Sequence, residues 1–288
     1  MTTFTVSPPP HRRSKISIKT LMWGRVAALV PISLAAIYFF GFAAIGNIAA
    51  SILGAVGIEL VIQKAFKYEL TILDGNAVYI GLLLALICPP TLPAWMIFVA
   101  AMFAVGICKH AFGGIGSYVF HPALAAWVFL SLSWAQDMLP GTTPITSSFS
   151  DMIFETGAGF LGEVSPILVL LTGVALIATK FIEWRIPVAY FLTTVILAVL
   201  LGDPVSYVMT GTFLLGVLFI ATDTVTSPVT KNGRIIYGIL CGVLTVLYGY
   251  FSGNYVWGTL YALLLANAAA PYIEVNTLPK PVGGVAHE

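Results

Sequence analysis

Ten apolar runs, each bounded by glycine, proline or charged residues, limit most strongly how this chain can fold. They lie near residues 23–42, 43–63, 75–88, 93–108, 121–134, 164–180, 186–201, 205–221, 235–250 and 256–273. Of the 288 residues, 59% are hydrophobic and only 9% are charged, whereas soluble domains carry about 25% charged residues. Runs of this kind are typical of membrane-crossing helices. The sequence therefore predicts an all-α integral membrane protein.

Several of these runs are too short for a complete crossing, which takes about 20 residues. The runs at 75–88 and 121–134 are the clearest cases, with 14 residues each. Irregular or short segments are tolerated at membrane depth where neighbouring helices shield them. We therefore expect some of the ten helices to be short or broken.

The distribution of charge predicts the orientation. If ten spans follow an inside N-terminus, all thirteen lysine and arginine residues fall on the inner side. The outer side then contains Asp137, Asp151, Glu155, Glu163 and Asp203. Basic residues favour the cytoplasmic side, so both termini are expected in the cytoplasm. The polar segment 1–20 lacks the apolar core of a signal peptide.

A faint internal repeat divides the chain in two. GRVA at 24–27 recurs as GEVS at 162–165, and FGG at 112–114 recurs as FSG at 251–253, with offsets of 138 and 139. Five spans per half make the halves cross the membrane in opposite senses, and such inverted repeats place a ligand or pathway at their interface. We predict a cytoplasmic tail at 1–20, five-helix repeats at 21–134 and 162–275, an outer loop at 135–161 and a cytoplasmic tail at 276–288.

Composition and motifs exclude several functions. The net charge of +1 gives no indication of a nucleic-acid partner. Membrane lipid is expected to surround the apolar helices. Cys88, Cys108 and Cys241 are scattered and are interpreted as apolar fillers, and the four histidines lack metal-binding spacing. Motifs for ATP hydrolysis or proteolysis are absent. A transporter, a channel and an electron-transfer subunit remain open.

A few polar residues lie where burial is costly. Asp74 precedes the run at 75–88 and either caps that helix or lines a site. Glu59, inside the second run, either pairs with Lys64 or Lys67 or serves an ion or proton pathway.

Two inner segments carry further polar groups. His121 stands before Pro122, a residue that suits the first turn of a helix, and is expected to cap that helix or to make an interhelical hydrogen bond. The loop at 221–234, ATDTVTSPVTKNGR, includes Thr222, Asp223 and Arg234. Its hydroxyls and cations suit a phosphate or carboxylate, and a polar turn explains them equally well.

Five stretches go further as a resemblance. In order, they are DGNAVYIGLLLALICPPTLP, FGGIGSYVFHPALAAW, GEVSPILVLLTG, WRIPV and FIATDTVTSPVTKNGRIIYG. They resemble the family that contains the D subunit of the Rnf complex and the B subunit of the sodium-pumping NADH:quinone reductase. The similarity extends from about residue 12 to residue 275.

The resemblance implies an electron-relaying subunit of a redox-driven sodium or proton pump in the cytoplasmic membrane. It also implies partners, namely other Rnf-type membrane subunits and the iron–sulfur and flavin subunits. The alternative is a flavin-free transport, channel or scaffold subunit of a related complex.

The resemblance further implies FMN, which in this family is usually esterified through its phosphate to the threonine of a GETS pattern. Gly162, Glu163 and Ser165 match that pattern, but Val164 stands at the attachment position. Because valine has no hydroxyl, the flavin is held non-covalently, or Ser165 carries it, or it has been lost. The expected cofactor-binding residues are Gly162, Glu163, Val164, Ser165, Asp74, Thr222 and Asp223. The family's NPAL is HPAL here, with His121 in place of asparagine.

Overall fold

A computed structural model describes residues 17–139, 159–202, 208 and 210–279. Within these ranges all regular structure is helical, and ten helical segments match the ten predicted runs. The predicted all-α membrane fold is thus confirmed. The start of the eighth run, most of the outer connecting loop and most of both predicted tails lie outside the described residues.

The first half of the chain supplies five helices. They are α1 (Ile18–Phe40), α2 (Phe42–Ala65), α3 (Asn76–Leu86), α4 (Ala94–Phe103) and α5 (Pro122–Ser133). The helix α4 continues as a π-helix, η2 (Ala104–Lys109), and a 3-10 turn, η3 (His110–Phe112). Another 3-10 turn, η1 (Ile72–Asp74), precedes α3.

The second half supplies the other five. After the 3-10 turn η4 (Leu161–Glu163) come α7 (Pro166–Ala178), α8 (Arg185–Leu201), α9 (Gly211–Leu215), α10 (Lys231–Ser252) and α11 (Tyr255–Thr277). The short α9 continues as a π-helix, η6 (Gly216–Ile220). Among the described residues, the two halves therefore each show one π-helical segment.

Helix length separates complete spans from partial ones. Five helical segments are long and apolar enough to cross a membrane, namely α1, α2, Ala94–Phe112, α10 and α11. The others, α3, α5, α7, α8 and the α9–η6 segment, are apolar but shorter. The expectation of short helices shielded by their neighbours is confirmed for α3, where ten of eleven residues are buried.

The helix starts follow the local sequence. The side chains of Ser17, Thr230 and Asn254 each accept a hydrogen bond from a backbone N–H in the first turn of the helix that follows. Asp74 takes the capping role, because its Oδ1 accepts from the backbone N–H of Asn76 at 2.7 Å. Pro122 occupies the first turn of α5, as predicted, but the preceding His121 makes no side-chain cap bond.

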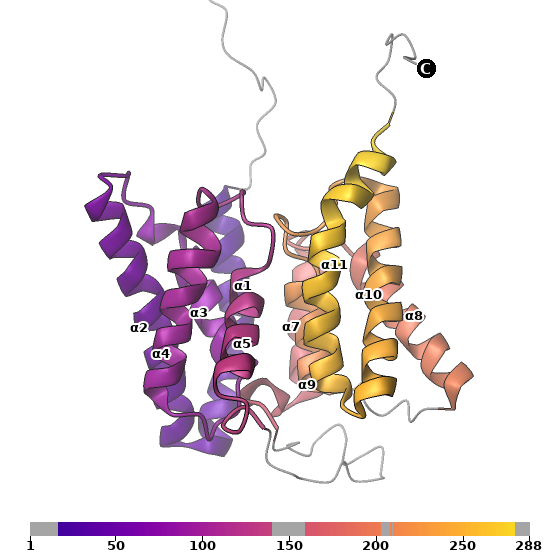
Figure 1. Cartoon of the computed structure of the whole chain (residues 1–288), viewed down its shortest axis with the longest axis horizontal. Helices are drawn as coiled ribbons and strands as arrows, with labels where there is room; N and C mark the ends of the chain where they lie inside the picture. The colour runs from indigo at the N-terminus through magenta and orange to yellow at the C-terminus, as the bar shows by residue number, and fades with distance from the viewer. Residues whose placement is uncertain (1–16, 140–158, 203–207, 209, 280–288) are drawn as a thin grey trace, which may run out of the picture.

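The two sets of helices lie side by side (Figure 1), with the first half in indigo to magenta and the second in pink to yellow. The described start of α1 and the end of α11 lie at the same edge of the molecule. Contacts between the sets join α1 to α7, α5 to α11, and η4 to both α1 and α3. The seam between the halves is therefore built on α1, α3 and α5 from the first half and on η4, α7 and α11 from the second.

Glycine also allows a very close backbone approach within the second half. A Cβ atom on Gly211 would lie 2.7 Å from the Cα atom of Glu163 and would also strike the carbonyl oxygen of Gly162. Both neighbours are backbone atoms, which cannot move aside as a flexible side chain can. The start of α9 can therefore meet the turn η4 only through glycine.

We expect Gly211→Ala to destabilise the protein by about 1–3 kcal/mol, the usual cost of overpacking. Thermal unfolding in detergent measures this as a midpoint several degrees lower. Gly46→Ala, on α2, is the matched control because a Cβ atom there has no neighbour within 4 Å. Equal midpoints for the two variants would contradict the close approach.

Candidate functional site

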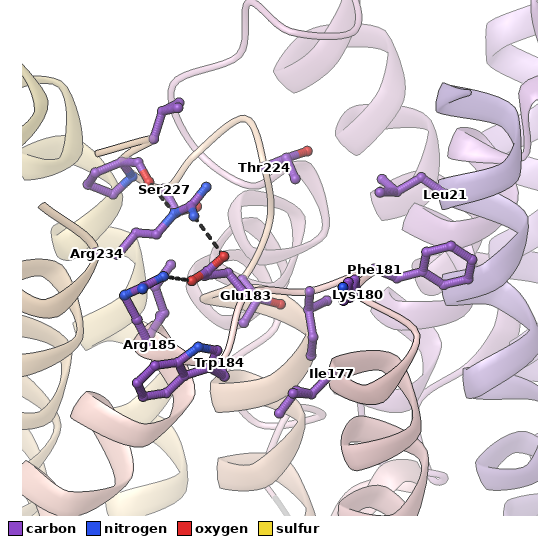
Figure 2. Close-up of a pocket in the computed structure, with 15 residues that line it drawn as sticks. Leu21, Ile177, Lys180, Phe181, Glu183, Trp184, Arg185, Thr224, Ser227 and Arg234 are labelled. Carbon is purple, nitrogen blue, oxygen red and sulfur yellow. Dashed lines mark hydrogen bonds and ion pairs between the residues drawn. The ribbon is translucent and has the colours of Figure 1, made fainter. Parts of the chain in front are cut away.

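A hollow of about 610 Å³ lies where the first turn of α1 meets two loops of the second half. Its walls come from the α7–α8 connection and from the loop that leads into α10 (Figure 2). Glu183 lies in its lining, accepts a hydrogen bond from Arg185 and forms an ion pair with Arg234 at 3.0 Å. From the loop predicted to suit an anion, Thr222, Ser227 and Arg234 line this hollow.

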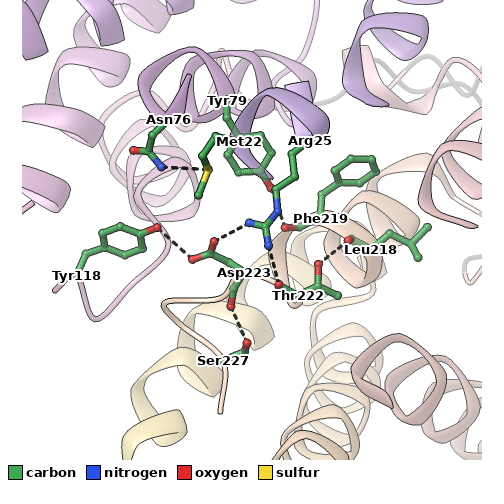
Figure 3. Close-up of polar contacts among 10 residues, drawn as sticks. All are labelled: Met22, Arg25, Asn76, Tyr79, Tyr118, Leu218, Phe219, Thr222, Asp223 and Ser227. Carbon is green, nitrogen blue, oxygen red and sulfur yellow. Dashed lines mark hydrogen bonds and ion pairs between the residues drawn. The ribbon is translucent and has the colours of Figure 1, made fainter. Parts of the chain in front are cut away.

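Next to the hollow, an ion pair joins the two halves in the interior (Figure 3). The guanidinium of Arg25, on α1, donates to the Oδ1 atom of Asp223 at 2.9 Å, and both side chains are 1% exposed. The same guanidinium donates to the carbonyl of Thr222 at 3.1 Å. Because an isolated charge is very costly to bury, each of these groups depends on the other.

Aromatic and hydroxyl groups complete this buried cluster. Tyr118 donates from its hydroxyl to Asp223 Oδ2 at 3.2 Å. The hydroxyl of Tyr79 donates to the carbonyl of Phe219 at 2.9 Å, and the ring of Tyr79 lies 5.6 Å from the Arg25 guanidinium carbon. His121 is buried with its ring 6.2 Å from that of Tyr79, and its Nδ1 atom has no hydrogen-bond partner among the described residues.

A second buried ion pair lies within the first half. Lys109, the last residue of η2, donates to Glu59 Oε1 at 2.8 Å, and both side chains are buried. The prediction that Glu59 pairs with Lys64 or Lys67 is therefore wrong. It fails because those lysines lie along or just beyond α2 itself, whereas burial of Glu59 requires a cation from a packed neighbour. Glu59 Oε2 has no hydrogen-bond partner among the described atoms.

Each ion pair includes a residue that lies in, or shortly after, a π-helical segment. Lys109 ends η2, and Asp223 follows η6 by three residues. π-Helical turns are rare and frequently occur at functional sites. Their wider turns leave backbone carbonyls for other donors, as the bond from Tyr79 to the Phe219 carbonyl within η6 illustrates. The structure thus places its costly charges next to these two irregular helices.

The GEVS segment lies at the opposite end of the α9–η6 segment from Asp223. Glu163 is buried, and its Oε2 accepts from the backbone N–H of Phe160 at 3.1 Å, while Oε1 has no partner among the described residues. Val164 is 1% exposed and packs in the core. Ser165 caps α7 by accepting from Leu168 N at 3.4 Å.

The predicted cofactor-binding residues therefore fall into separate places. Gly162 to Ser165 adjoin the start of α9, whereas Thr222 and Asp223 follow the end of η6. The ten residues between Gly211 and Ile220 correspond to about 15 Å of helix at 1.5 Å per residue. Asp74 caps α3, two residues before Asn76, whose amide contacts Met22 beside the Arg25 cluster.

Comparison with known proteins places this arrangement in a family. The NQR2, RnfD, RnfE family profile matches residues 5–283. The chain belongs to this family. It is 77% identical, over the full length of both chains, to the D subunit of an ion-translocating oxidoreductase complex from Methanosarcina acetivorans. This finding confirms the resemblance inferred from the sequence motifs.

Two further relatives in the family are more distant. The D subunit of a Na(+)-translocating ferredoxin:NAD(+) oxidoreductase complex from Acetobacterium woodii is 38% identical, with 97% of this chain and 95% of the relative covered. The D subunit of a proton-translocating complex of the same kind, from Clostridium ljungdahlii, is 33% identical, with 97% and 96% covered. All three relatives match over nearly their whole length.

The family pattern for a flavin phosphoester does not fit the residues at 162–165. Val164 has no hydroxyl and faces the core, and the Ser165 hydroxyl already caps α7. A side chain on Gly162 would strike the carbonyl of Leu86 at 2.9 Å. The segment is packed as a structural turn. A phosphate ester at position 164 is ruled out chemically because valine has no hydroxyl.

Sequence reasoning missed Arg25 and the two tyrosines of the buried cluster. In the sequence, Arg25 stands out only as one of the inner basic residues, and Tyr79 and Tyr118 belong to no recognisable polar motif. One signal is present, because the GRVA and GEVS matches align Arg25 with Glu163, the only charged residues in either tetrapeptide. A charged residue at the same repeat position in both halves predicts a role at their interface.

The Arg25–Asp223 pair gives a sharp stability prediction. Arg25→Met and Asp223→Asn should each destabilise the protein by about 3–5 kcal/mol, because each leaves an uncompensated buried charge. The double variant should lose less than the sum of the two single losses, since neither charge of the pair then remains buried. Thermal unfolding in detergent provides the measurement.

Lys19→Met serves as the control for the loss of a cation, since Lys19 is exposed on the same helix. It should leave the unfolding midpoint unchanged. Additive losses in the double variant would show that Arg25 and Asp223 act independently, contrary to the ion pair.

Proposed function

We propose that this chain is the membrane-embedded D subunit of an Rnf-type complex that couples electron transport to the translocation of sodium ions or protons. The observation that carries the proposal is the 77% identity, over the whole of both chains, to the D subunit of an ion-translocating oxidoreductase complex. The proposed partners are the other membrane subunits of that complex and its iron–sulfur and flavin subunits.

The buried charges support a role in ion translocation. Ionisable side chains within a membrane are expensive and are a mark of function. Two such ion pairs adjoin π-helical segments, and one of them joins the halves of the chain. Inverted repeats place a pathway at the interface between their halves, which is where Arg25 and Asp223 lie.

For the cofactor, we propose FMN held without a covalent bond. The packed Val164 argues against attachment at position 164. Glu163 and Thr212 are buried polar side chains that lie close together at the first turn of α9. The same packing favours the alternative, a flavin-free subunit that contributes only to transport or assembly.

For the orientation, we propose that the edge with the start of α1 and the end of α11 faces the cytoplasm. Lys19 and Lys231 lie at the starts of α1 and α10, and Lys67 and Lys180 follow the ends of α2 and α7. With ten spans that alternate in direction, all four positions fall on the side where α1 starts, in agreement with the enrichment of basic residues in cytoplasmic loops. The protein then lies in the cytoplasmic membrane, with the connection between α5 and η4 on the outer side.

The first test is purification through a tag on this chain. We expect the other Rnf-type subunits to co-purify, and the denatured chain to have its unmodified mass. Native mass spectrometry of the chain released from the complex should show an increment of one FMN that denaturation removes. Co-purification without any FMN increment would favour the flavin-free alternative, and failure to co-purify would contradict the proposed function. An increment that survives denaturation and disappears in Ser165→Ala would instead place the flavin on Ser165.

A second test addresses orientation. The native cysteines at 88, 108 and 241 are buried, so a new surface cysteine can be labelled against a low background. In intact cells, a membrane-impermeant maleimide should label Asp137→Cys, and it should label Lys67→Cys only after permeabilisation. The reverse pattern would invert the proposed topology.

A further inference from the structure

The hollow beside α1 carries more positive than negative charge. Its lining contains the cations Lys180, Arg185 and Arg234 and a single carboxylate, Glu183. Glu183 pairs with both arginines (Figure 2). Lys180 has no ion-pair partner among the described residues. A second negative group in the hollow would therefore meet a surplus of positive charge.

Backbone groups add to this surplus. Trp184 and Arg185, at the start of the 17-residue helix α8, line the hollow, and no side chain caps that helix start. The first N–H groups of a helix lack internal partners and carry the positive end of the helix dipole. An anion placed there receives both charge and hydrogen-bond donors.

Part of the remaining wall is apolar. Leu21, Ile177, Phe181 and Ile186 line the same hollow. Trp184 is 52% exposed, and the Arg185 guanidinium carbon lies 5.1 Å from its ring. Tryptophan beside arginine is typical of the level of the lipid headgroups. An occupant that matches both kinds of wall has an anionic head and a hydrocarbon tail.

We propose that this hollow binds the phosphate headgroup of an anionic membrane lipid, with an acyl chain along the apolar wall. Basic pockets between membrane helices on the cytoplasmic side recognise such headgroups. Lys180 and the start of α8 hold the phosphate, and Glu183 keeps the two arginines in place while weakening the attraction. The site does not depend on whether the chain carries a flavin.

The position of the site gives the lipid a structural role. The hollow is lined by Leu21 on α1 and by Thr222 and Thr224, the residues on either side of Asp223. The same two segments are joined by the Arg25–Asp223 pair. A bound lipid thus braces the contact between the halves at the cytoplasmic end of that pair.

The test is native mass spectrometry of the full-length protein in its complex, delipidated and titrated with phosphatidylglycerol. The decisive comparison is Lys180→Gln against Lys67→Gln. Both lysines are exposed at the same edge and have left-handed backbones, with φ of 60° and 56°, but only Lys180 lines the hollow. Lys180→Gln should weaken lipid binding about fivefold, which corresponds to about 1 kcal/mol per cation near an anionic surface. Lys67→Gln should bind as the wild type does.

A variant that is expected to bind lipid more tightly separates the loss of a binding group from a loss of folding. Glu183→Gln removes the carboxylate that competes for Arg185 and Arg234, so it should strengthen phosphatidylglycerol binding several-fold. Weaker binding in this variant, or equal losses in the two lysine variants, would overturn the proposed site.

Two further ligands identify the source of the phosphate group. Phosphatidylcholine, which is zwitterionic, should bind less tightly than phosphatidylglycerol and should lose little in Lys180→Gln. Inorganic phosphate at millimolar concentration should not displace the lipid. Displacement by phosphate alone, or equal affinity for the two lipids, would overturn the assignment to an anionic lipid.

Discussion

Arg25 and Asp223 belong to different halves of the chain, and each is 1% exposed. Neither group can leave water at a tolerable cost unless the other arrives with it, because desolvation costs several kcal/mol per ion. Docking of the halves and formation of the ion pair are therefore one event. The bonds from Arg25 to the Thr222 carbonyl and from Tyr118 to Asp223 add to the same event. Because another docking of the halves would leave a buried charge without its partner, the ion pair favours this arrangement of the seam.

The short α9–η6 segment has a buried charged residue near each of its ends. Glu163 adjoins its first residue, Gly211, and Arg25 binds the Thr222 carbonyl just beyond its last turn. An acid at the N-terminus and a base at the C-terminus both favour the helix dipole, and the effect is larger where water is excluded. The two residues occupy matching positions in the GRVA and GEVS tetrapeptides. Glu163 and Arg25 thus lie near opposite ends of this helix.

Hydropathy and charge are sufficient to predict the ten helices, because apolar runs bounded by glycine and proline leave few other folds in lipid. They do not predict the partners of buried charges. Proximity in sequence assigns Glu59 to Lys64 or Lys67, but packing brings Lys109 to it from 50 residues away. The π-helical segments also escape prediction, since their sequence looks like that of any apolar helix. Where a site depends on contacts distant in sequence, local patterns give only some of its members, such as Thr222 and Asp223, and not its geometry.

The packing of Val164 explains how the segment at 162–165 can exist without a flavin ester. Gly162 allows contact with α3, Glu163 accepts from Phe160 N, and Ser165 starts α7. Each of these roles is structural and requires no hydroxyl at position 164. Valine there fills a core site, where a polar side chain would need a partner. The segment therefore has a sufficient physical reason to keep three of the four residues of the family pattern, even though attachment at position 164 is chemically impossible.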